Sequence, residues 1–320
     1  TVRKEDPPDK KAGDMTINNR KFTVWTTYWD TGNLEKEFDD IKENIDGICY
    51  FAAYFNEKQK PFIPKETLDT YDMVKSKYQD THFTSYLTFV NDVQKSDGSN
   101  SLKDTEVLYS LFSNRKTMKA HIEDIIHMTI EGGFDGIEID YEAIKKDEKL
   151  WRLYIQFIKD LYEKGRNEGL MVRIVLEPNT PTEKIVFPKG PEYVIMCYNL
   201  HGYGTRPGPK ATPDFLKDMV IKMKNIPGKK SFAVATGGFD FGEDGSVKTV
   251  TELEARQIEE EFNRVSLRDG KSYSLVFRYE EKGIFHEVWY ADKETIAFWF
   301  DEIESLGDYG LSLWRLGGNY

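Results

Sequence analysis

Short apolar runs alternate with amphipathic stretches along nearly the whole chain. Eight runs rich in apolar or β-branched residues have the character of strands, and stretches such as Leu34 to Glu43 and Lys149 to Gly165 have helical periodicity. This alternation favours a closed (β/α)8 TIM barrel in the α/β class over an open sheet. The predicted strands are Phe22 to Trp29, Asp46 to Tyr54, His82 to Val90, Phe134 to Glu142, Leu170 to Leu176, Tyr193 to Tyr198, Ser231 to Ala235 and Tyr309 to Trp314.

Two segments depart from this alternation. Tyr273 to Tyr279 and Ile284 to Tyr290 flank a Glu-Glu-Lys-Gly turn, so a β-hairpin insertion of about residues 266–292 is expected between strands 7 and 8. The charged, proline-containing start of the chain predicts a disordered tail over residues 1–20, followed by one catalytic domain over 21–320. Whether the tail is a tether, for example a lipid-anchored one, is left open.

The fourth predicted strand carries an unusual row of acidic residues. Asp135, Glu138, Asp140 and Glu142 fall within eight positions, interleaved with apolar residues. Alternate strand residues share a face, so the last three carboxyls point the same way. On a solvent-exposed edge strand, such an acidic row could occur by chance. A strand that lies between two helices, however, is buried in an α/β fold. Buried carboxylates cost several kcal/mol each without partners, so the row indicates chemistry.

Composition and charge narrow the ligand class. The chain has 320 residues, is 14% aromatic and has a formal net charge of −11. This charge argues against nucleic acid as a partner, because nucleic acid is anionic and binds to basic surfaces. Abundant aromatic side chains suit a carbohydrate, although ordinary cores are also aromatic. We expect a monomer with no cofactor.

The remaining candidate residues give no metal site. Cys49 and Cys197 lie in apolar runs and are expected to be buried free thiols. His121 and His127 do not have the four-residue spacing of a helical metal pair. No apolar run is long enough to span a bilayer, and no signal segment is seen. The expected location, extracellular or at the cell envelope, is inferred only from the polymer substrate expected below.

The carboxyl row predicts a reaction. Glu142 lies nearest the C-terminal rim, where barrel active sites form, and its neighbours' charges favour a protonated general acid. Neighbouring carboxyls on one strand are about 7 Å apart and approach a sugar from one side. The nucleophile is therefore expected to be the substrate's own 2-acetamido oxygen, the substrate-assisted exception to the two-carboxylate scheme. Glu177, just past strand five, is a further candidate.

Three motifs of the chain resemble those of a known family. Residues 135–142 are similar to the Asp-Gly-x-Asp-x-Asp-x-Glu signature of glycoside hydrolase family 18, the chitinase-like barrels. Met196-Cys197-Tyr198-Asn199 is similar to the family's Met-x-Tyr-Asp, and Trp314 matches on strand eight. The segments 198–202, 207–209 and 313–317 resemble the branch of spore-cortex and germination peptidoglycan hydrolases.

The resemblance implies roles for particular residues. Glu142 is the expected acid, Asp140 orients the acetamido group and Tyr198 hydrogen-bonds to it. The expected substrate-binding residues are Glu138, Tyr28, Trp29, Asn199 and Trp314, with Trp314 flooring the sugar at the cleavage site. The substrate is then a polymer or glycan containing N-acetylglucosamine: peptidoglycan, chitin or an N-glycan.

This chain departs from the family at two positions. The family usually has Asp in place of Glu138 and in place of Asn199. The small-residue signature of strand three is also not evident in His82 to Val90. Two other functions remain open. One is a chitinase-like lectin that binds such glycans without cleaving them, against which the retained Glu142 argues. The other is a barrel enzyme that uses the row for a divalent metal.

Overall fold

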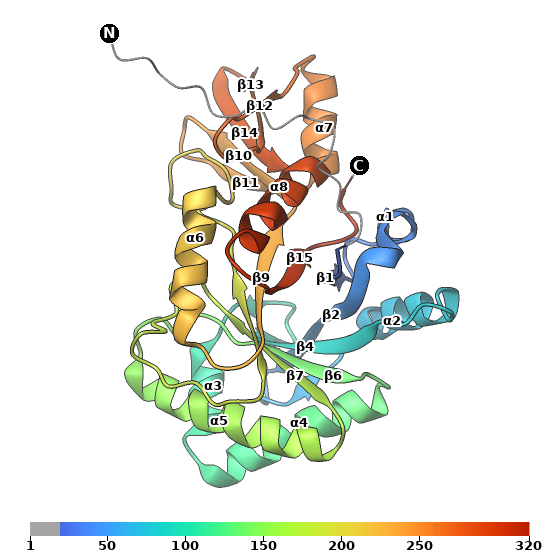
Figure 1. The fold of residues 1–320 in the computed structure, drawn as a ribbon, viewed down its shortest axis with the longest axis vertical. Helices are drawn as coiled ribbons and strands as arrows, with labels where there is room; N and C mark the ends of the chain where they lie inside the picture. The colour runs from blue at the N-terminus through green and yellow to red at the C-terminus, as the bar shows by residue number, and fades with distance from the viewer. Residues whose placement is uncertain (1–19, 320) are drawn as a thin grey trace.

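The computed structural model describes residues 20–319, so residues 1–19 of the predicted tail lie outside the described residues. Parallel strands close into a barrel in the order β1-β2-β4-β6-β7-β8-β9-β15. Their bounds are β1 Phe22–Thr27, β2 Ile45–Asn56, β4 Thr84–Gln94, β6 Gly136–Asp140, β7 Met171–Leu176, β8 Glu192–Met196, β9 Lys230–Ala235 and β15 Gly310–Trp314. The predicted (β/α)8 barrel is therefore confirmed (Figure 1).

Helices follow most barrel strands and cover the barrel's outer surface. They are α1 Leu34–Ile41, α2 Lys65–Lys77, α3 Thr105–Phe112, α4 Arg115–Glu131, α5 Glu148–Asn167, α6 Pro213–Lys222 and α8 Lys293–Glu304, with 3-10 turns η1 Lys42–Asn44 and η2 Met223–Asn225. Between β7 and β8 the described chain crosses in turns and has no helix. None of the helices in residues 20–319 is long and apolar enough to cross a membrane.

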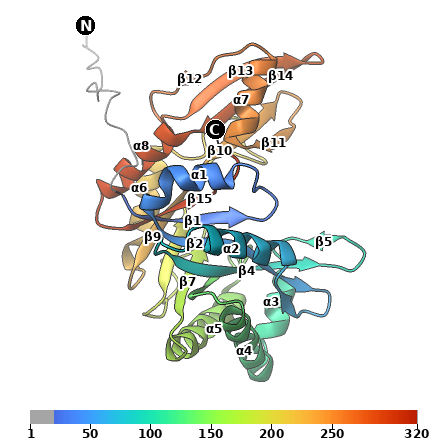
Figure 2. The ribbon, with the colours of Figure 1, turned by 90° about the vertical axis from the view of Figure 1, so that its right-hand side faces the viewer.

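The predicted hairpin belongs to a larger antiparallel sheet. Strands β13 Leu275–Glu281 and β14 Ile284–Ala291 form the hairpin, joined by β10 Gly237–Gly242, β11 Val247–Val250 and β12 Leu267–Arg268 in the order β11-β10-β14-β13-β12. Helix α7, Glu252–Glu261, packs against this sheet. The insertion thus begins at Gly237, well before residue 266. It stands beside the barrel at the end away from α3, α4 and α5 (Figures 1 and 2).

Strand alternation divides the barrel core into two sets of side chains. Ile137 and Ile139 of β6 pack outward against the helices. Inward positions include Trp25, Cys49 and Tyr86, which pack together in the barrel interior. The predicted buried free thiols are confirmed at both cysteines. Two short strands, β3 Pro61–Phe62 and β5 Asn100–Ser101, extend β2 and β4 as hairpins at the rim.

A buried carboxylate joins the two ends of the described chain. Glu37 on α1 is 2% exposed and accepts hydrogen bonds from the backbone N–H of Gly317 at 2.9 Å and of Asn319 at 2.7 Å. The Asn319 side-chain amide donates a third at 2.7 Å. The segment after β15 is thereby fixed against the first helix, where the barrel closes between β15 and β1.

Candidate active site

The local geometry of β6 follows from the first two residues of the motif. Asp135 accepts a hydrogen bond from the backbone N–H of Ser85 at 2.9 Å, which ties the strand to β4. A Cβ at Gly136 would lie 2.6 Å from the Tyr86 ring, so only glycine allows that ring to pack here. The strand ends at Asp140, before the predicted end at Glu142. Glu142 therefore lies beyond the strand at the barrel's C-terminal rim.

Glu138 lies deepest in the row and is enclosed by donors. Its side chain is 0% exposed and accepts hydrogen bonds from Trp25 Nε1 at 2.6 Å, Thr88 Oγ1 at 2.8 Å, Arg173 Nε at 3.0 Å and Cys49 Sγ at 3.2 Å. Arg173 is directly opposite Glu138 in the β6–β7 register. The sequence predicts Glu138 as a substrate-binding residue, but this carboxylate cannot touch a ligand because its oxygens are already occupied.

Asp140 occupies the middle of the row with one oxygen free. The residue is 8% exposed, and its Oδ1 atom is buried with no hydrogen-bond partner among residues 20–319. Burial, followed by the nearby charges of Glu142 and Glu138, raises its pKa well above the usual value. Asp140 therefore holds a proton more tightly than an ordinary aspartate does, and it has an oxygen available for a ligand's N–H group.

Glu142 is positioned at the mouth by contacts to both its backbone and its carboxylate. Asn91 on β4 accepts from the Glu142 N–H at 2.8 Å and donates to its carbonyl at 3.1 Å. Lys103 Nζ lies 2.5 Å from Glu142 Oε2, and the glutamate side chain is 18% exposed. Burial raises the Glu142 pKa, with Glu177 and Asp92 adding to the rise, while Lys103 opposes it. The result is a carboxyl that titrates above its usual range.

Of three residues near this carboxyl, the sequence predicts one and misses two. Glu177 Oε2 accepts from the backbone N–H of Ala143 at 2.9 Å, so the sequence candidate Glu177 does lie beside the row. Asn91 and Lys103 are not predicted, because each lies in an ordinary polar setting with no motif around it. A positive φ of 51° at Lys103, just after β5, turns the chain there and brings its side chain to Glu142.

Lys103 gives a prediction on pH dependence. In Lys103→Met the positive charge that lowers the Glu142 pKa is gone, so that pKa rises further. The general acid predicted at Glu142 acts in its protonated form, so the alkaline limb of the pH profile of kcat/KM should move to higher pH. Lys95→Met, on the same rim hairpin, is the matched control and should leave the limb in place. A Lys103→Met limb that is unchanged or lower contradicts the ion pair's role.

The aromatic candidates lie around the mouth. Tyr198 and Trp314 are half-buried and pack on the interior cluster, and Trp314 lies 5.0 Å from the Phe51 ring, centroid to centroid. Burial and the charges of the carboxyl row raise the Tyr198 pKa well above its usual value, so its hydroxyl remains a donor. Trp29 is 50% exposed and Tyr28 contacts it edge-on. Asn199 is exposed, with a φ of 60° that asparagine tolerates.

Sequence comparisons connect the chain to bacterial glycosylases. No family model matches it. The uncharacterized glycosylase YvbX of Bacillus subtilis (strain 168) is 23% identical over 235 residues, covering 67% of this chain and 66% of the relative. The cortical fragment-lytic enzyme of the same organism is 24% identical over 237 residues, covering 67% of this chain and 54% of the relative. The chain thus spans about half to two thirds of the curated relatives it matches.

Solved structures share the fold over nearly the whole chain. The spore cortex-lytic enzyme SleL of Bacillus megaterium QM B1551 superposes with a TM-score of 0.76 at 17% identity, covering 95% of this chain and 72% of that one. A chitinase of Chromobacterium violaceum ATCC 12472 gives 0.76 at 16% identity, covering 93% and 95%. The names glycosylase, cortex-lytic enzyme and chitinase support the predicted glycosidase class. Relatives and fold together confirm the resemblance drawn from the motif, which is to glycoside hydrolase family 18 near its spore-cortex branch.

Proposed function

We propose that the chain is a retaining glycosidase that cleaves β-linked N-acetylglucosamine in a polysaccharide or glycan by substrate-assisted catalysis. The observation that carries this proposal is a rim carboxyl of raised pKa beside a second carboxyl that has an unsatisfied oxygen. Glu142 titrates above its usual range, and Asp140 has a raised pKa and an unsatisfied Oδ1 atom. Cleavage after N-acetylglucosamine needs one proton donor for the glycosidic oxygen and one acceptor for the amide N–H, and this pair supplies both.

The reaction is proposed in two steps. Glu142 gives its proton to the glycosidic oxygen as the C1–O bond breaks, and the 2-acetamido oxygen attacks C1 to form an oxazolinium ion. Asp140 accepts the amide N–H, and this hydrogen bond strengthens as positive charge develops on the ring. The Glu142 carboxylate then takes a proton from water, which attacks C1 and opens the ring with retained configuration.

The position of the carboxyls supports a nucleophile from the substrate. Glu142, Asp140 and Glu177 all come from β6, β7 or the residues directly after them, so they approach the sugar from one side. Asp30, which follows β1 across the mouth, is paired with Arg315. Tyr198 is proposed to donate to the acetamido oxygen, and Trp314 to stack under the sugar ring. The site of action would be the cell envelope or the extracellular space.

Product analysis tests the reaction. The wild-type protein is incubated separately with peptidoglycan, chitin and an N-glycan, and products are identified by mass spectrometry. We expect reducing ends at N-acetylglucosamine with β configuration and no cleavage of analogues lacking the 2-acetamido group. A covalent glycosyl-protein adduct would contradict the substrate-assisted route. Binding to these glycans without any product would instead support the lectin alternative.

A substitution at Asp140 tests its part in the mechanism. In Asp140→Asn the side chain is nearly isosteric, but the carboxyl that offsets developing charge is lost. We expect kcat to fall on the order of 10²-fold, the usual worth of one preorganised polar group, with a smaller change in KM. The measurement is initial rates on a chromogenic N-acetylglucosaminide. An unchanged kcat contradicts the proposed role of Asp140.

A further inference from the structure

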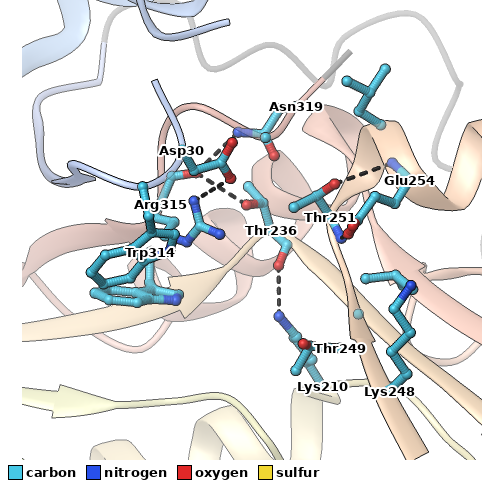
Figure 3. A pocket seen from close by; sticks show the side chains of 15 residues that line it. Asp30, Lys210, Thr236, Lys248, Thr249, Thr251, Glu254, Trp314, Arg315 and Asn319 are labelled. Atoms are coloured by element: carbon cyan, nitrogen blue, oxygen red, sulfur yellow. Dashed lines mark hydrogen bonds and ion pairs between the residues drawn. The ribbon is translucent and has the colours of Figure 1, made fainter. Parts of the chain in front are cut away.

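A cavity lies at the barrel mouth beside β15, across from the carboxyl row. It has a volume of about 620 Å³ and is lined by Trp29 and Trp314 together with residues of the inserted sheet and α7 (Figure 3). In the closed strand order, β15 is four places from β6, so the two strands face each other across the barrel. Glu142 and Asp140 do not line this cavity, whereas Trp314 both lines it and packs on the interior cluster that Tyr198 also contacts.

Three cations from three different segments line the cavity. Lys210 comes from the loop after β8, Lys248 from β11 of the inserted sheet and Arg315 from the residue after β15. Figure 3 shows them gathered around the same space. Their convergence depends on the insertion, because Lys248 is brought to the barrel mouth only by the sheet that carries it.

Two of these cations have no carboxylate partner. Arg315 is paired with Asp30, and the Glu254 carboxylate accepts from the Thr251 N–H as part of a helix cap. Lys210 Nζ donates to the Thr236 carbonyl at 2.7 Å and lies 5.6 Å from the Phe239 ring centroid. Within residues 20–319, neither Lys210 nor Lys248 forms an ion pair. Burial and the Arg315 charge lower the Lys210 pKa to about 7, as expected for an amine that lacks a counter-ion.

We propose that this cavity binds a carboxylate carried by the sugar that precedes the cleaved N-acetylglucosamine, an inference that rests on the proposed function. Glu142 protonates the leaving oxygen, so the leaving part of the glycan lies on the β6 side of the mouth. The glycan then runs over Trp314, and the next sugar on the retained side reaches the cavity. Chitin offers only neutral sugars there, whereas peptidoglycan has a lactyl ether, ending in a free carboxylate or in an acidic peptide, on alternate sugars. The cavity therefore favours an anionic, alternating glycan as the substrate class.

Binding to an inactive variant tests this site separately from catalysis. Glu142→Gln is titrated by calorimetry with chitotetraose, with a peptide-free alternating glycan that has free lactyl groups, and with the same glycan bearing its acidic peptides. We expect one or both carboxylate-bearing glycans to bind about tenfold more tightly than chitotetraose at low salt, and this ratio to fall as salt is raised. A preference for the first glycan assigns the lactyl carboxylate, and a preference for the second assigns the peptide.

Variants at the lysines decide whether the cavity is responsible. Adding Lys210→Met or Lys248→Met to the inactive variant should bring the affinity ratio toward one. Lys210→Arg should restore part of it. Lys217→Met, an exposed lysine on α6 away from the cavity, is the matched control and should keep the ratio. Because Lys248 is exposed, its variant tests the proposal even if Lys210→Met fails to fold.

The outcomes separate this inference from the proposed function. The cavity assignment is overturned if Glu142→Gln binds the carboxylate-bearing glycans no more tightly than chitotetraose. It is also overturned if the preference persists after both lysine substitutions. If the wild-type protein hydrolyses none of peptidoglycan, chitin and the N-glycan, the proposed function is overturned. A lysine-dependent binding preference in the calorimetry would still support the anionic site.

Discussion

Replacing Glu142 by Gln is expected to lower turnover by roughly 10²–10⁴-fold, the usual contribution of a general acid. The amide cannot donate a proton of comparable acidity to the glycosidic oxygen, nor can it later activate water. The fold should survive, because the backbone contacts between Glu142 and Asn91 do not involve the side chain that changes. The measurement is kcat on the glycan found by product analysis, with circular dichroism as the check on folding.

Glu177→Gln is the matched control for this substitution. Glu177 lies beside Glu142, and the Gln carbonyl can still accept from the Ala143 N–H. The control removes one neighbouring charge that raises the Glu142 pKa but leaves the proton donor in place. We expect its kcat to fall by less than about tenfold. Equal losses in the two variants, or near wild-type turnover in Glu142→Gln, would remove Glu142 from its assigned role.

Replacing Arg173 by Met should destabilise the barrel by about 3–5 kcal/mol, because it leaves a buried carboxylate without its counter-charge. Glu138 and Arg173 are 0% and 1% exposed, and the guanidinium also lies 3.2 Å from Glu192. Glu192 retains Lys229 as a partner at 3.3 Å, but Glu138 has only neutral donors left. Urea unfolding, followed by fluorescence, measures the change in the free energy of unfolding.

Two further variants show whether this cost comes from the unpaired charge. Glu138→Gln/Arg173→Met removes both charges, and the Gln carbonyl can still accept from Trp25 and Thr88, so we expect part of the stability to return. Arg152→Met disrupts an exposed pair with Glu148 on α5 and should change stability by less than about 0.5 kcal/mol. A double variant as unstable as Arg173→Met would assign the loss to packing of the long side chain instead.

Periodicity predicted the barrel because each buried strand reads as a short apolar run between amphipathic helices. The inserted sheet was only partly predictable. Strand β10 begins with Gly237-Gly238, which reads as a loop, yet Gly238 is needed because a Cβ there would lie 1.7 Å from the Trp289 carbonyl oxygen. The hairpin β13–β14 is predictable because apolar and polar residues alternate along both strands on either side of a clear turn.

In the site, the motif predicted the acidic row but not what surrounds it. Arg173 lies opposite Glu138 only because β6 and β7 pair in one particular register, and no local pattern in the sequence gives that register. Lys103 reaches Glu142 from a rim hairpin thirty-nine positions earlier in the chain. Partners of this kind depend on closure of the barrel, so the roles of Glu138 and Glu142 are readable from the sequence only as candidates.

The hydrogen bonds of Glu37 to Gly317 and Asn319 have a practical consequence for protein engineering. Truncation after Leu316 would remove all three donors and leave a carboxylate that is 2% exposed without them. Such a truncated protein should express poorly or melt early, even though every barrel strand is still present. An affinity tag is therefore better joined beyond Asn319, with a flexible linker, than in exchange for residues 317–319.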